Sequence, residues 1–226
     1  MRETIRIMMV EDHAGYRQAL ERSLRRRENM TLQSQYGTAE FALRDIQYAA
    51  AKDVPEILLL DLNLPGMTGL ESIPWFKEYA PELKIIVLSQ SNAEEDILKA
   101  INLGASGYLL KSARFRDIVD GIQTVIDGGA SLDPQIANFI LSKVKMLQPN
   151  SEPTSKTLSA REVETLSLLG EGFSKKEIAE KLEISTTTVA YHVRNIYDKL
   201  DALNAPAAVA KGFMTGILPI TKPSSE

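Results

Sequence analysis

The chain has 226 residues, of which 44% are hydrophobic and 25% charged, and its net charge is −4; this is typical of a globular protein with one large domain or two smaller ones. It has no cysteine, which excludes disulfides and thiolate metal sites. The acidic balance gives no overall indication of nucleic-acid binding. The chain runs directly into a strand pattern and has no apolar run near the roughly 20 residues of a membrane span. We therefore expect no signal peptide, no membrane segment and a cytoplasmic location.

Strand and helix patterns alternate five times in the first half of the chain. Unbroken apolar runs without alternation predict strands that are covered on both faces, as in a parallel sheet. The expected strands are Ile5–Val10, a weaker one at Met30–Tyr36, Ile57–Leu60, Lys84–Leu88 and Gly107–Leu110. Helical spacing follows each of them, and the last of these helices is expected over Phe115–Ile126. The pattern predicts a doubly wound, flavodoxin-like α/β domain with a five-stranded parallel sheet.

Polar residues stand where four of these strands end. The first strand is followed by Glu11 and Asp12, the third by Asp61, the fourth by Ser89 and the fifth by Lys111. The carboxyl ends of parallel strands meet at one edge, where open α/β sheets bind ligands. Three carboxylates there repel one another unless a cation such as Mg²⁺ neutralises them. A lysine and a hydroxyl complete a phosphoryl-binding set, with Asp61 as the expected nucleophile.

Each residue has an ordinary structural interpretation when it is taken alone. Asp61 is then a strand terminator, Ser89 a loop hydroxyl, Lys111 a solvated lysine and Tyr108 a half-buried packing residue; only their convergence favours function. The enzymatic alternative is an aspartyl phosphatase, which carries a second aspartate two residues after its nucleophile as general acid and base. Asn63 stands there, and because an amide does not transfer protons, we expect a phosphoaspartate in this chain to turn over slowly.

Residues 1–127 resemble the receiver domain of bacterial two-component response regulators. The resemblance rests on Glu11-Asp12, the motif DLNLPGMTG of Asp61–Gly69, Ser89, and the motif GYLLK of Gly107–Lys111. It implies that a sensor histidine kinase phosphorylates Asp61 and that the chain is a phosphoacceptor rather than an enzyme. The Mg²⁺ ligands it implies are Glu11, Asp12, Asp61 and the carbonyl of Asn63. The phosphoryl-binding and switch residues it implies are Ser89, Lys111 and the aromatic Tyr108.

A connector is expected at 128–157. Leu132-Asp133-Pro134 predicts the start of a helix that runs to about Leu147, with the proline in its first turn. Gln148–Thr157 is rich in proline, serine and threonine without apolar periodicity, which predicts a flexible linker. The expected organisation is a receiver domain at 1–127, connector helix and linker at 128–157, and a second domain at 158–226.

The second domain has purely helical patterns. Ser159 with Glu162 and Ser174 with Glu177 are capping boxes that open two helices. A third helix is expected from Ser185 to about Leu200, and a fourth near 205–214. Two short helices joined by a tight turn predict a helix-turn-helix, with a compact three-helix core as the alternative.

This region resembles the LuxR-type DNA-binding domain, and the whole chain resembles a NarL/FixJ-type response regulator. The motifs are LSARE from Leu158, GFSKKEIA from Gly172, and STTTV from Ser185 with the later His192. The resemblance implies that the third helix enters the major groove of double-stranded DNA. The DNA-binding residues it implies are Lys175, Thr187, Thr188, Ala190, Tyr191 and Arg194. It also implies a homodimer on phosphorylation, paired through the fourth helix near Val209, on an operator with two half-sites.

The sequence departs from this pattern at Ala190, where the family usually has lysine, and at Ala205, where it usually has arginine. Basic and acidic residues are also equal in number from Lys156 onward. Because phosphate contacts dominate protein–DNA affinity, we expect weak binding as a monomer and recovery on dimerisation. The alternative is a regulator that acts through protein–protein contacts with weak or no specific DNA binding.

Overall fold

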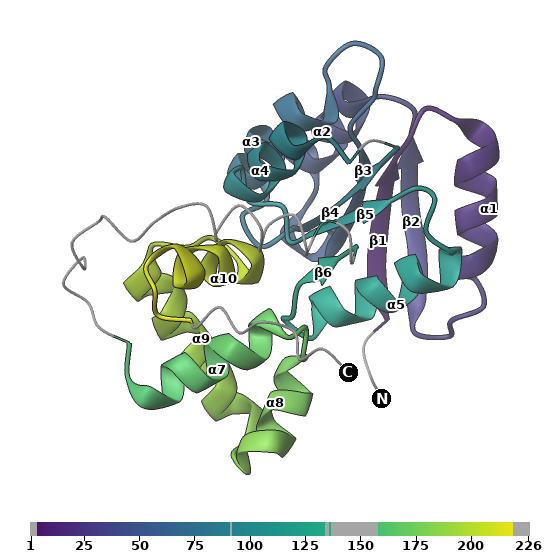
Figure 1. Cartoon of the computed structure of the whole chain (residues 1–226). Coiled ribbons are helices and arrows are strands. Elements are labelled where there is room, and N and C mark those ends of the chain that lie inside the picture. Colours follow the sequence, from purple (N-terminus) through teal and green to yellow (C-terminus); the bar gives the residue numbers. More distant parts are fainter. Residues whose placement is uncertain (1–3, 91, 134–135, 137–157, 219–226) are drawn as a thin grey trace. The chain divides into compact units, whose positions relative to one another are not determined.

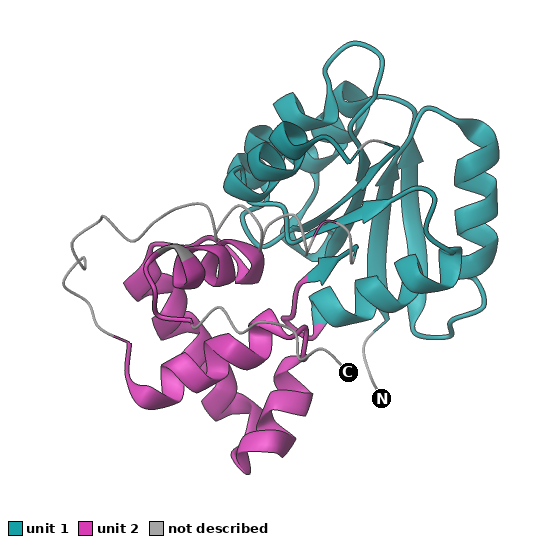
Figure 2. Ribbon diagram, in the orientation of Figure 1, with its two compact units in different colours: residues 1–126, 131–133 teal, residues 127–130, 134–226 magenta. Residues whose placement is uncertain are grey.

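The computed structural model describes residues 4–90, 92–133, 136 and 158–218. The chain divides into two compact units (Figure 2): Met1–Ile126 with Ser131–Asp133, and Asp127–Ala130 with Pro134–Glu226. Each unit has its own buried apolar cluster. In the described part of the chain, no helix is long and apolar enough to cross a bilayer.

The first unit is built on a parallel sheet. Its strands are β1 (Ile5–Val10), β2 (Met30–Tyr36), β3 (Ile57–Asp61), β4 (Lys84–Ser89), β5 (Gly107–Leu110) and β6 (Ser131–Leu132). Their order is β2-β1-β3-β4-β5-β6, and every neighbouring pair is parallel. All five residues of the central strand β3 are buried, as expected for a strand that is covered on both faces.

Helices cover both faces of this sheet (Figure 1). They are α1 (Ala14–Leu24) and α5 (Phe115–Ile126) on one face, and α2 (Ala39–Tyr48), α3 (Gly69–Tyr79) and α4 (Glu94–Asn102) on the other, with a short 3₁₀ helix η1 (Ala51–Asp53). Alternate strand residues such as Ile7, Met9 and Leu59 pack with Leu20 and Ile122 beneath α1 and α5. The predicted doubly wound α/β fold is confirmed.

In the described part of the chain the sheet has six strands, so the prediction of five was wrong. Ser131 and Leu132 lie beside β5 in register with Gly107 and Tyr108, and the Asp133 N–H donates to the Tyr108 carbonyl at 3.0 Å. A two-residue strand has no periodicity that a sequence could reveal. The pairing of β6 with β5 requires glycine at position 107, because a Cβ atom there would lie only 2.8 Å from the Ser131 carbonyl oxygen.

Leu132 therefore lies in a strand, whereas the sequence predicted the start of a helix there. The remainder of the expected connector helix and the expected linker Gln148–Thr157 lie outside the described residues, apart from Asp133 and Ile136.

The second unit contains four helices in its described residues: α7 (Ala160–Gly170), α8 (Lys175–Leu182), α9 (Thr186–Leu200) and α10 (Ala205–Met214). Both predicted capping boxes are formed. Between α8 and α9, Glu183 takes a left-handed conformation with φ 54°, which ends α8 and turns the chain. The buried cluster includes Ile178 from α8 and Val189 and Val193 from α9. The predicted helix-turn-helix is confirmed.

A partly buried ion pair joins α7 to α9 in this unit. The Glu162 side chain on α7 is 4% exposed, and its Oε2 atom lies 2.6 Å from the Lys199 Nζ atom on α9. The same oxygen accepts a hydrogen bond from the Ser159 N–H at 2.7 Å. Glu162 therefore caps α7 and also ties it to α9.

Candidate functional site

Three carboxylates meet at the carboxyl edge of the sheet. Because β1 and β3 are neighbours, the loop after β1 and the end of β3 lie side by side. Glu11 and Asp61 are buried, at 0% and 1% exposure, whereas Asp12 is exposed. One oxygen of each carboxylate lies within 4.8 Å of the others. The structure thus brings together the three acids that the strand-end pattern singled out.

Lys111 completes this cluster from the end of β5. Its Nζ atom lies 2.6 Å from Glu11 Oε2 and 2.8 Å from Asp61 Oδ2, and its side chain is only 8% exposed. Lysine is almost never buried to this degree unless it is paired. The ammonium therefore holds the two buried carboxylates in one place.

The charges in this cluster do not balance. Burial raises the pKa of the Glu11 carboxyl, the charge of Asp61 adds to this effect, and Lys111 with the His13 N–H only partly opposes it. Among the described residues of the cluster, three carboxylates face the single ammonium of Lys111, so negative charge is in excess. An all-oxygen donor set with surplus negative charge fits a hard divalent cation.

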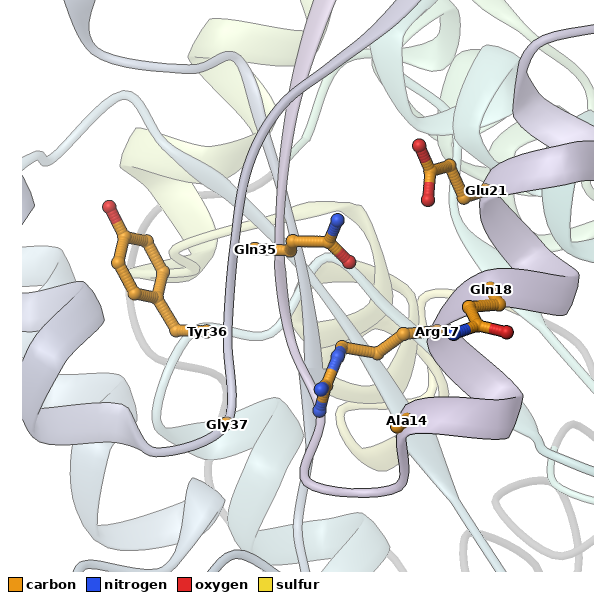
Figure 3. Close-up of a pocket in the computed structure, with 7 residues that line it drawn as sticks. All are labelled: Ala14, Arg17, Gln18, Glu21, Gln35, Tyr36 and Gly37. Atoms are coloured by element: carbon orange, nitrogen blue, oxygen red, sulfur yellow. The ribbon is translucent and has the colours of Figure 1, made fainter.

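The backbone of the β1–α1 loop is held by Arg17, which the sequence did not single out. The Arg17 Nη1 group donates to the carbonyl of Glu11, and at 2.9 Å to the carbonyl of Asp12. Figure 3 shows the Arg17 side chain extending from α1 along a cavity of about 300 Å³ that Gln35 and Tyr36 also line. The arginine therefore fixes the two residues that carry acids, without contacting their carboxylates.

The turn after β3 positions Asp61 and Asn63. The Asn63 N–H donates to Asp61 Oδ1 at 3.2 Å, and the Gly69 N–H donates to the Leu62 carbonyl at 3.0 Å. A Cβ atom on Gly69 would lie 2.1 Å from the Asp61 carbonyl oxygen. Only glycine therefore lets α3 begin so close to the end of β3.

Ser89 and Tyr108 lie together on the neighbouring strands. Ser89 ends β4, is 1% exposed, and accepts the Lys111 N–H on its carbonyl at 2.7 Å. Tyr108 on β5 is fully buried. Burial raises the pKa of the Tyr108 phenol, and a hydrogen bond with the Ser89 side chain partly offsets this. The two predicted switch residues are therefore in direct contact.

The predicted DNA-binding residues of α9 form one exposed face. Thr187, Thr188, Ala190, Tyr191 and Arg194 are all exposed. Val189 and Val193, on the opposite side of the helix, pack into the core. Thr188 also helps to start the helix, because its N–H donates to the Ser185 Oγ atom at 3.0 Å.

The two remaining predicted residues of this unit are less exposed. Lys175, the first residue of α8, is half-buried. Val209 on α10 is partly buried and packs on the helical core, close to Gly170, where a Cβ would lie 3.3 Å from Val209 Cγ1. Its role in dimerisation stays a prediction.

A parallel sheet with this acidic edge and lysine, followed by a helix-turn-helix unit, defines the class of response regulators. The chain belongs to that family. Residues 7–123 match the response regulator receiver domain, and residues 156–211 match the bacterial regulatory proteins of the luxR family. It is a NarL/FixJ-type response regulator with a receiver domain and a LuxR-type DNA-binding domain, so both resemblances are confirmed.

Relatives extend this similarity over nearly the whole chain. The nitrate/nitrite response regulator protein NarL of Escherichia coli K12 is 30% identical over 198 residues, covering 88% of this chain and 90% of NarL. The transcriptional regulatory protein LiaR of Bacillus subtilis 168 is 32% identical, covering 87% of this chain and 91% of LiaR. The name of LiaR favours transcription regulation over action through protein contacts alone.

A solved structure gives the same fold for part of the chain. The crystal structure of a two-component response regulator of the LuxR family from Aurantimonas sp. SI85-9A1 matches with a TM-score of 0.58 and 29% identity. It covers 62% of this chain and 98% of that one.

Proposed function

We propose that this response regulator is switched by phosphorylation of Asp61, with a sensor histidine kinase as the phosphodonor. The observation that supports this most directly is the buried Asp61 carboxylate, which lies 2.8 Å from Lys111 Nζ in a cluster with two further acids. An Asp61 oxygen forms a bond to phosphorus while the phosphorus–nitrogen bond of the phosphohistidine breaks, and the imidazole nitrogen keeps the electron pair. Lys111 stabilises the negative charge on the phosphoryl oxygens.

Magnesium is the cofactor that this donor set fits. Glu11, Asp12, Asp61 and the carbonyl of Asn63 would hold the ion, because they offer oxygen ligands and an excess of negative charge. When bound, Mg²⁺ neutralises the carboxylates and the phosphoryl oxygens. Arg17 keeps the Glu11–Asp12 backbone in place for this purpose.

Ser89 and Tyr108 are the proposed switch. A phosphoryl oxygen on Asp61 is a stronger hydrogen-bond acceptor than the Tyr108 hydroxyl, so the Ser89 hydroxyl turns toward it. Tyr108 then loses the hydrogen bond that it makes in this structure, and the surface around α4 and β5 changes. The modification shifts a pre-existing equilibrium toward a dimer-competent state.

The exposed face of α9 is the proposed DNA-binding surface. The proposed location of the protein is the cytoplasm. Thr187 and Thr188, at the start of the helix, would meet phosphates, and Arg194 would hydrogen-bond a guanine. Ala190 and Tyr191 offer apolar contact to thymine methyl groups. Dimerisation through α10 near Val209 raises the effective concentration of the second DNA-binding domain at the second half-site of the operator.

Self-dephosphorylation of this chain should be slow. Asn63 occupies the position that a general acid and base would need, and its side chain is exposed. A long-lived phosphoaspartate suits a stored signal rather than multiple turnover.

The test compares the wild-type chain, Asp61→Asn and the control Asp53→Asn, which changes an exposed aspartate in η1. Each protein is incubated with Mg²⁺ and acetyl phosphate, and dimerisation and selection of DNA from a random pool are then measured. We expect phosphodonor-dependent dimerisation and an enriched two-half-site sequence for the wild type and Asp53→Asn, and no response for Asp61→Asn. An Asp61→Asn protein that responds like the wild type would overturn the proposal.

A further inference from the structure

A cavity of about 500 Å³ opens beside Lys111, between the start of α1 and the residues that follow β5. Its lining includes Tyr16, Gln90, Lys111 and Phe115. The carboxylate cluster explains Lys111 but leaves the aromatic side of this cavity without a role.

The Tyr16 ring is the aromatic side chain in contact with the ammonium. The Lys111 Nζ atom lies 5.2 Å from the centroid of the Tyr16 ring, within the range of a cation–π contact. The Phe115 ring packs on Tyr16 with 5.4 Å between ring centroids. Since the same ammonium contacts Glu11 and Asp61, Tyr16 is one contact away from the phosphorylation site.

The Tyr16 hydroxyl is buried, and no hydrogen-bond partner reaches it among the described residues. Burial raises the pKa of this phenol, and the charges of Glu11 and Asp61 add to that effect. The group is therefore a neutral donor that lies within the field of the carboxylates but donates to neither. A buried donor without an acceptor is unfavourable, and such groups are rare in folded proteins.

We propose that the Tyr16 hydroxyl donates a hydrogen bond to an oxygen of the phosphoryl group on Asp61; this inference rests on the proposed phosphorylation of that residue. Among the described residues, no acceptor lies within hydrogen-bond distance of this hydroxyl. A phosphoryl group on Asp61 adds three strong acceptor oxygens to the site. Lys111, Ser89 and a metal ion do not use every lone pair of those oxygens. Tyr16 thus joins Ser89 and Lys111 as a third side chain of this unit that recognises the modification.

Tyr16→Phe tests this, because it removes the hydroxyl and keeps the ring that packs on Lys111 and Phe115. The control is Tyr48→Phe, which removes a hydroxyl from a side chain that is 78% exposed on α2. Beryllofluoride serves as the phosphoryl probe, and calorimetric titration of the full chain in Mg²⁺ gives its affinity. We expect about tenfold weaker beryllofluoride binding for Tyr16→Phe, as for the loss of one hydrogen bond to a charged group, and no change for Tyr48→Phe.

Two further readouts separate this role from a structural one. Without beryllofluoride, Tyr16→Phe should bind Mg²⁺ as the wild type does, and it should melt no lower, because the variant removes an unpaired buried hydroxyl. Equal beryllofluoride affinity of Tyr16→Phe and wild type overturns the inference while the proposed function stands. A wild-type chain that binds no beryllofluoride overturns the proposed function itself.

Discussion

Each unit contains a lysine that is paired with buried carboxylate groups, two in the first unit and one in the second. The balance of charge around the two lysines differs. In the second unit, Lys199 faces Glu162, whose oxygen also accepts the Ser159 N–H. In the first unit, Lys111 faces both Glu11 and Asp61, with Asp12 close to them. The closest ion-pair distance is 2.6 Å in both, so distance alone does not separate a structural pair from a binding site.

The pKa directions separate them. Although burial acts to raise it, hydrogen bonds from Lys199 and Ser159 hold the pKa of the Glu162 carboxyl below its usual range. The pKa of Glu11 is raised, because burial and Asp61 outweigh Lys111. The Glu162–Lys199 pair has one charge of each sign, whereas the cluster around Lys111 has three carboxylates for one ammonium, an arrangement that favours a cation.

Replacing each lysine in turn should give the largest difference in stability between the two units. Lys111→Met leaves two buried carboxylates unpaired and should cost about 3 kcal/mol of unfolding free energy at pH 7 without metal. Lys199→Met should cost only about 1 kcal/mol, because that side chain is 32% exposed and its pair is partly solvated. Urea unfolding followed by hydrogen exchange of peptides from each unit measures both values. Equal losses would show that the charge balance is unimportant.

Arg17→Gln should weaken Mg²⁺ binding by about 10- to 100-fold, as is typical when a group that orients metal ligands is lost. Arg17 donates to the backbone carbonyls of Glu11 and Asp12 and contacts neither carboxylate, so the acids stay in place but less firmly held. Calorimetric titration with Mg²⁺ measures the change. Arg22→Gln, an exposed arginine on the same helix, is the control, and an Arg17→Gln affinity equal to that of Arg22→Gln would contradict this role.

Glu162→Gln should destabilise the second unit by about 1–2 kcal/mol, through the lost ion pair and the weakened cap. The amide keeps the shape of the side chain and one acceptor oxygen for the Ser159 N–H. Hydrogen exchange of α7 and α9 amides in the full chain reports the loss. Glu164→Gln, on the exposed side of α7, provides the comparison, and protection unchanged by Glu162→Gln would remove Glu162 from the structural account.

The smallest expected effect is a dependence of the stability of the second unit on pH. Because the folded-state pKa of Glu162 lies below its ordinary value of 4.5, the stabilisation it provides is fully present above pH 4.5 and is lost as the pH falls through the folded-state pKa. The loss should be about 1 kcal/mol or less. Exchange protection of α9 between pH 6 and pH 3 should therefore fall more steeply in the wild type than in Glu162→Gln, and parallel curves would refute this assignment.

The strand-end cluster was predictable because unbroken apolar runs identify parallel strands, and parallel strands bring their carboxyl ends together. Glu11, Asp61 and Lys111 follow from that rule without knowledge of any side-chain position. The four helices of the second unit followed from their capping boxes and apolar spacing.

The remaining features depend on packing that no local pattern encodes. Arg17 acts on backbone carbonyls, which every residue has, and Tyr16 fits the apolar spacing of α1 as well as any hydrophobic residue. The Lys199–Glu162 pair joins two helices that meet only in the folded unit. Strand β6 depends on the space that Gly107 leaves.

That last strand fixes the place at which the chain leaves the first unit. The chain leaves the first unit after Ile126, returns to add Ser131–Leu132 to β5, and leaves again after Asp133. The Asp133 N–H donates to the carbonyl of Tyr108. A displacement of the β5 backbone therefore shifts Ser131–Asp133 with it, and a force on Asp133 acts in turn on the strand that carries Tyr108.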